Sequence, residues 1–76
     1  MKISHAIEQF QQGVLDSIEI RRSPGNRYQW FVVIKSNQGK TYFLADHDDN
    51  TIAEESLEKL FSMLKQIGFK DAQIFF

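Results

Sequence analysis

The chain of 76 residues contains no cysteine and no long apolar run. The lack of cysteine excludes disulfide bonds and thiolate metal sites, and it is typical of proteins in a reducing cytoplasm. No window approaches the ~18 consecutive apolar residues of a membrane-spanning helix. Residues 1–10 alternate polar and apolar side chains, unlike a secretory signal peptide. We therefore expect a cytoplasmic protein with neither a transmembrane helix nor a signal peptide.

An excess of charge of one sign is also missing, because 9 Lys and Arg stand against 10 Asp and Glu, for a formal net charge of −1. Such a chain has no global attraction for nucleic acid or membranes. The charge is divided unevenly, however. Residues 1–40 carry six basic and three acidic side chains, and residues 41–76 carry three and seven. We expect the two halves to attract each other, within one chain or between two copies.

Motifs of catalysis and metal binding are scarce. The two histidines lie far apart, and no nucleophile motif or glycine-rich phosphate loop is present. Asp46, Asp48 and Asn50 have the spacing of the first calcium-loop ligands, but Thr51 stands where such a loop needs glycine. We therefore predict a non-enzymatic protein with no cofactor, no metal site and no small-molecule substrate.

The short length limits the core that the chain can build. A domain of this size buries about 60% of its unfolded surface, so small domains need an additional source of stability. Ten aromatic residues, seven of them phenylalanine, are a heavy apolar load for this length. With disulfides excluded, a dimer interface is the remaining way to bury more apolar surface. We expect a single domain over residues 1–76 that forms a homodimer.

The segment from Arg27 to Leu44 predicts a central β-hairpin. Two runs rich in aromatic and β-branched residues flank a polar turn around Gly39. The first run is apolar on both sides, which is typical of a strand in the middle of a sheet. One face of that strand would carry Trp30, Val32 and Ile34, and the other Phe31 and Val33.

The flanking segments predict two helices and two more strands. Apolar residues recur with helical spacing between positions 3 and 14, and we expect Ser4 to be the N-cap of this helix and Gly13 to end it. Residues 14–21 alternate as a strand, and residues 72–76 form a last strand. Thr51 and Glu54 fit a capping box, which would begin a second helix with an apolar stripe to Ile67. The order α-β-β-β-α-β predicts an α+β fold: a two-layer sandwich with an antiparallel β-meander, a C-terminal strand and both helices on one face.

Two helices on one face leave the other face of the sheet uncovered. We predict that this face binds a protein partner or a second copy through Phe31, Val33 and Phe43, since apolar patches on small proteins usually mark interaction surfaces. The register of the third strand decides whether Phe43 with Thr41, or Tyr42 with Leu44, lies on this face. The alternative is that a loop or the first helix covers Phe31 and Val33.

A turn at residues 23–26 joins the strand of residues 14–21 to the central hairpin and forms a second hairpin tip. This tip is a second candidate surface, because Arg21, Arg22 and Arg27 lie close in sequence to Tyr28 there. Arginines interleaved with aromatic residues contact phosphates and stack on bases. This pattern gives an alternative function as a nucleic-acid-binding protein. The competing interpretation is a solvated tip, or cations that pair with the acidic half of a second chain.

Several landmarks resemble a set of short bacterial proteins carried on plasmids and integrative elements and labelled as replication-associated. The landmarks are Phe10 and Gly13, Trp30-Phe31, the segment from Gly39 to Leu44, the Asp46–Asn50 loop and the segment from Leu64 to Phe69. The resemblance implies a bacterial cytoplasmic accessory protein that works in plasmid or mobile-element replication or regulation. It implies no site residues.

Overall fold

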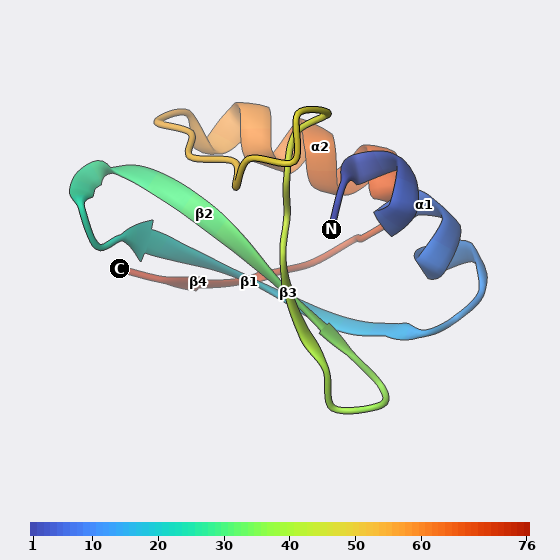
Figure 1. The fold of residues 1–76 in the computed structure, drawn as a ribbon. Helices are drawn as coiled ribbons and strands as arrows, with labels where there is room; N and C mark the ends of the chain where they lie inside the picture. The colour runs from blue at the N-terminus through green and yellow to red at the C-terminus, as the bar shows by residue number, and fades with distance from the viewer.

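The computed structural model describes every residue from Met1 to Phe76 and has the expected α+β architecture. Four strands form one open sheet, and Figure 1 shows both helices on the same side of it. The elements are α1 (Ile3–Gln11), β1 (Leu15–Ser23), β2 (Asn26–Ser36), β3 (Thr41–Phe43), α2 (Leu57–Ile67) and β4 (Gln73–Phe75). The predicted order and the two-layer sandwich are therefore confirmed.

The strands lie in the order β3-β2-β1-β4. The pairs β1–β2 and β2–β3 are antiparallel, as a meander requires, whereas β4 pairs with β1 in the parallel direction. The return through α2 makes this parallel pairing possible, because parallel neighbours need a long crossover. β4 therefore joins the sheet of its own chain at one edge.

The hydrophobic core fills the space between the sheet and the two helices. The apolar side chains of β1 and β2 that face the helices pack against the inner faces of α1 and α2. Leu60 and Leu64 of α2 are almost fully buried there, as the predicted stripe requires. The core residues are Ala6, Ile18, Ile20, Trp30, Val32, Ile34, Leu44, Leu60, Leu64 and Ile67.

Both predicted helix starts are wrong. α1 begins at Ile3 after Lys2, so Ser4 lies inside the helix and caps nothing. α2 begins at Leu57, where the hydroxyl of Ser56 accepts from the backbone N–H of Lys59 at 3.3 Å. The predicted helix ends are correct: Gly13 has φ +75°, and Gly68 has φ +127°.

The capping box at Thr51 does not form, because its residues extend the sheet. Glu54 exchanges two backbone hydrogen bonds with Trp30, at 2.8 and 3.0 Å, and Ile52 N–H donates to the carbonyl of Leu44. The Glu54 carboxylate accepts from the backbone N–H of Ser56 instead of closing a helical turn. A strand partner for Trp30 therefore takes precedence over a local helix signal.

Candidate interaction surface

The side of the sheet away from the helices is named here the open face. Neither helix covers it (Figure 1). Its residues alternate along each strand with the core residues, as the pleat of a sheet requires. They are Ser17, Glu19 and Arg21 of β1, Phe31, Val33 and Lys35 of β2, Thr41 and Phe43 of β3, and Gln73 and Phe75 of β4.

Phe31 and Phe43 form the apolar centre of the open face. Their rings meet edge to face with centroids 5.7 Å apart, a favoured geometry for an aromatic pair. Phe43 is 52% exposed, and Phe31 is half-buried. The register places Phe43 beside Val33, which decides the open question of the third strand: Phe43 and Thr41 lie on the open face, and Tyr42 packs against the core.

Val33 is less exposed than expected for a residue of the binding surface. It lies on the open face as predicted, but it is only 6% exposed. Its cross-strand neighbours are Glu19 on one side and Phe43 on the other, and these longer side chains leave it little contact with solvent. At the centre of the open face the accessible apolar area therefore comes from Phe31 and Phe43, and Val33 lies beneath them.

A charged cluster crosses the open face next to the rings. The carboxylate of Glu19 accepts from Arg21 Nε at 2.9 Å and pairs with Lys35 Nζ at 3.1 Å, so each of its oxygens has a cation. The Glu19 side chain is 11% exposed, the lowest of the three. The hydrogen bonds from Lys35 and then Arg21 lower the pKa of Glu19, against a smaller opposing effect of burial. Two cations and one anion leave this cluster with one surplus positive charge.

Arg21 links the charged cluster to a third ring. Its guanidinium lies 4.0 Å from the centroid of the Phe75 ring, a cation–π contact across the β1–β4 pair. On the other side, Arg21 is directly opposite Phe31 in the β1–β2 register. The row Phe75, Arg21, Phe31 therefore spans three strands of the open face.

The structure separates the predicted cluster at the hairpin tip. Arg21 lies on the open face, but Arg22 lies on the helix side, where its guanidinium stacks 3.9 Å above the ring of Trp30. Arg22 Nη1 also donates to the backbone carbonyl of Arg27. Arg27 lies 5.7 Å from the ring of Tyr28, which is 65% exposed. The tip thus joins Arg22, Arg27 and Tyr28 but not Arg21.

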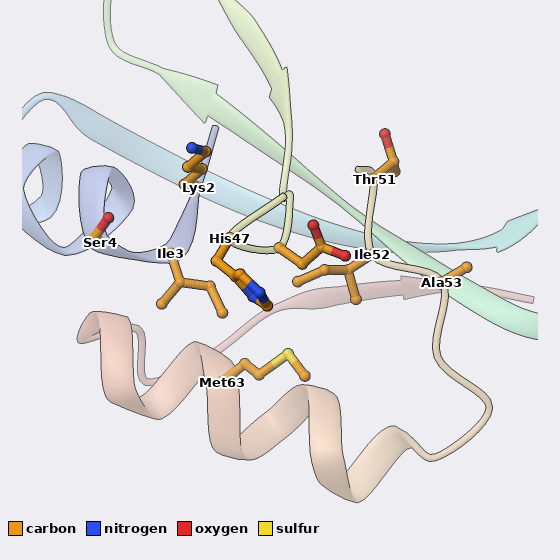
Figure 2. Close-up of a pocket in the computed structure, with 9 residues that line it drawn as sticks. Lys2, Ile3, Ser4, His47, Thr51, Ile52, Ala53 and Met63 are labelled. Atoms are coloured by element: carbon orange, nitrogen blue, oxygen red, sulfur yellow. The ribbon is translucent and has the colours of Figure 1, made fainter. Parts of the chain in front are cut away.

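A cleft of about 780 Å³ lies between the start of α1, the loop after β3 and α2. Figure 2 shows Ile3, Ile52 and Met63 around this cleft, with His47 between them. The His47 side chain is 92% exposed, and its Nε2 lies 3.5 Å from a carboxylate oxygen of Asp48. The cleft is open and has mixed lining, so it suggests no particular ligand.

The calcium-loop residues have a structural role. One carboxylate oxygen of Asp46 accepts from the backbone N–H groups of Asp48 and Asn50, at 2.9 and 3.0 Å. Asp49 takes φ +67° in the same loop. No group of three His, Asp or Glu side chains in the chain could hold a metal ion.

Comparisons with protein-family models, with curated proteins and with solved structures find no match for this chain. The resemblance to short plasmid-borne proteins stays a prediction. Neither helix is long and apolar enough to cross a membrane.

Sequence reasoning missed Lys35 and Phe75 as members of the candidate surface. In β1, Glu19 and Arg21 alternate with the buried Ile18 and Ile20 and so lie on the opposite face, but only the register shows that they meet Phe31 and Val33. Lys35 belongs to the period-2 pattern of Phe31 and Val33, so extending that pattern would have included it. Phe75 gave no signal, because nothing local to residues 72–76 specifies β1 as the partner strand.

Proposed function

We propose that the protein is a non-enzymatic self-assembly module in which the open face of one copy packs on the open face of a second copy. The observation that carries the proposal is the edge-to-face pair Phe31–Phe43 on a sheet face without helices, with Phe43 half exposed. Exposed apolar groups of this kind mark interaction surfaces. Two sheets that pack face to face stand about 10 Å apart, which large rings fill well.

The charged cluster is suited to burial in such an interface. Glu19 already has a cation on each oxygen, so covering the face does not leave an unpaired carboxylate. Arg21 lies over the ring of Phe75, and arginine and aromatic side chains are the types enriched in protein interfaces. Lys35 is 46% exposed, so its ammonium keeps contact with water while it pairs with Glu19.

A two-fold axis fits this surface better than a head-to-tail contact. In an isologous dimer the same patch is used twice, and the assembly closes without leaving a second patch exposed. The hollow of about 300 Å³ next to Phe31 and Phe43, against the segment 51–53, offers space for an exposed ring of the other copy. We propose that Phe43 of each copy occupies this hollow of the other.

The mass of the particle in solution tests the proposal. Sedimentation or light scattering over a concentration series should give a dimer for the native chain and a monomer for Phe43→Asp. Tyr28→Asp is the matched control, because Tyr28 is an exposed aromatic residue outside the open face. Thermal melts of all three chains separate loss of assembly from loss of folding.

A second candidate function is contact with single-stranded nucleic acid at the hairpin tip. Arg22 and Arg27 form no ion pair with a carboxylate, and both lie next to an aromatic ring. Cations that stay unpaired are available for phosphates, and Tyr28 is exposed enough to stack on a base. The resemblance to replication-associated plasmid proteins agrees with this candidate. The net charge of −1 opposes long-range attraction, so we rank it second.

A further inference from the structure

The two edges of the sheet differ in what covers them. At the β3 edge, the backbone N–H of Ala45 donates to the carbonyl of Met1 at 2.8 Å, and Lys2 forms a parallel bridge with Ala45. β4 at the opposite edge pairs only with β1, and no segment of the chain lies along its outer side. An edge strand with free backbone groups is a template for one more strand.

An apolar groove of about 340 Å³ follows this free edge on the helix side. Phe61 and Leu64 of α2 form one wall, and Ala72 and Ile74 form the other. No residue of β1 lines the groove, so it lies beside β4 on the outer side and not beneath the middle of the sheet.

Phe69 also lines the groove and makes two contacts within the chain. Its ring meets that of Phe10 edge to face at 5.0 Å, and its backbone N–H donates to the carbonyl of Leu64 at 3.0 Å. These contacts hold Phe69 without a ligand, which lowers the entropy cost of binding.

Charges at the groove indicate the chemistry of its occupant. Lys65 and Lys70 are exposed and line it, together with Asp71, which leaves one surplus positive charge. Neither lysine forms an ion pair within the chain. A ligand with an apolar group for the groove and a carboxylate for the lysines would satisfy both features.

We propose that the free edge of β4 binds an extended acidic peptide segment of a partner protein as a fifth strand. The peptide backbone pairs with β4, one apolar side chain enters the groove against Ile74 and Phe61, and an acidic side chain two residues away meets Lys65 or Lys70. The spacing follows from the strand itself, because alternate side chains point to the same side. Strand addition of this kind takes affinity from main-chain hydrogen bonds and specificity from the pockets.

Two other occupants fit less well. A second copy of β4, paired antiparallel about Ile74, would place Phe76 opposite Ala72 and near the groove, but its paired residues 72–76 carry no acidic side chain for Lys65 or Lys70. A fatty acid would supply both an apolar chain and a carboxylate but would leave the backbone groups of β4 unused. The acidic peptide is the occupant that uses the edge, the groove and the lysines together.

Fluorescence anisotropy with three labelled synthetic peptides tests the proposal. The first contains Glu-Thr-Phe-Thr-Glu, with Phe and both Glu on one side of an extended strand. The second replaces both Glu by Lys, and the third carries N-methyl groups on the backbone of the first. We expect saturable binding of the first peptide alone, and a loss of about tenfold or more in affinity for each of the others.

Charge-reversal variants of the protein test whether the peptide binds at the groove beside β4. Lys65→Glu with Lys70→Glu should weaken binding of the acidic peptide about tenfold, because two exposed cations become repulsive. Lys59→Glu is the matched control on α2, since Lys59 is exposed but does not line the groove. It should change the affinity less than about twofold, as expected of a screened distant charge.

Three results would overturn the proposal. The first is no saturation up to about 1 mM peptide, where binding is too weak for recognition. The second is equal binding of the acidic and basic peptides. The third is equal binding of the N-methylated peptide, which would indicate a ligand held by the groove without strand pairing. Phe43→Asp should bind the acidic peptide like the native chain, so failure of the self-assembly proposal is visible separately.

Discussion

The ring of Phe10 occupies the space that a side chain on Gly68 would need. A Cβ atom built on Gly68 would stand 2.5 Å from Cε1 and 2.7 Å from Cδ1 of that ring. This contact joins the end of α2 to α1. Phe10 also packs edge to face on Phe69, which follows Gly68 in the chain. Gly68 therefore allows the C-terminal end of α2 to pack closely against the C-terminal end of α1.

Gly68→Ala should lower the free energy of unfolding by about 2 kcal/mol or more. The residue has φ +127°, where a Cβ is strained, and the new methyl group would force the Phe10 ring to move. Urea denaturation monitored by circular dichroism measures the loss. Gly25→Ala is the control, since Gly25 has open space around its Cα and no positive φ. Equal stability of the two variants would contradict the packing described for Phe10.

The stability of the fold should fall on acidification in a way that depends on Glu19. Its cations lower its pKa below the ordinary value of 4.5, so the unfolded chain binds this proton more tightly than the folded one. The stabilisation is therefore present above pH 4.5 and is lost as the pH falls through the lower folded pKa. Urea midpoints between pH 7 and about pH 3 measure this loss.

Glu19→Gln should remove that part of the pH dependence. The variant should be less stable than the native chain at pH 7, and the difference should shrink toward low pH, where the native carboxyl is also neutral. Glu8→Gln is the control, because Glu8 is an exposed side chain on α1 outside any ion pair. Parallel curves for the native chain and Glu19→Gln would show that the cluster contributes nothing to folding.

Nucleic-acid binding at the hairpin tip has its own prediction. If this second candidate function holds, a labelled single-stranded oligothymidine should bind at low salt and be released as the salt concentration rises. Arg22→Glu with Arg27→Glu should abolish binding, because both unpaired cations of the tip become acidic. Arg21→Glu on the open face should disturb the Glu19 cluster and leave the oligonucleotide affinity nearly unchanged. Absence of any retardation at low salt removes this candidate.

The sequence predicts most of the fold because its strongest patterns are local. The stripe of α2 extends to Ile67 and ends at Gly68 as expected, and the two-sided apolar pattern of β2 correctly places it inside the sheet. The start of α2 could not be predicted in the same way. Thr51 and Glu54 carry a helix signal, but the backbone of Trp30, distant in sequence, takes Glu54 as a strand partner.

The residues of the candidate surface were harder to predict from the sequence than the fold was. The alternation of side chains along the strands predicts that Phe31 lies on the open face. Whether Phe43 or Tyr42 joins it depends on the strand register, which only the structure shows. The parallel pairing of β4 with β1 could not be predicted from the sequence, because three strand residues do not specify which strand they pair with. For that reason only the three-dimensional structure identifies Phe75 as part of the surface, together with the row Phe75, Arg21, Phe31.

The proposal of two open faces in contact is tested most directly by paramagnetic relaxation between copies. The chain has no cysteine, so Thr41→Cys gives a single attachment point for a spin label on the open face next to Phe43. Spin-labelled, isotopically unlabelled chain is mixed with ¹⁵N-labelled native chain, and only contacts between copies broaden the observed amides. We predict the strongest broadening at the amides of Phe31, Val33 and Phe43. No broadening at concentrations where the mass is dimeric, or broadening centred on α2, would contradict the account.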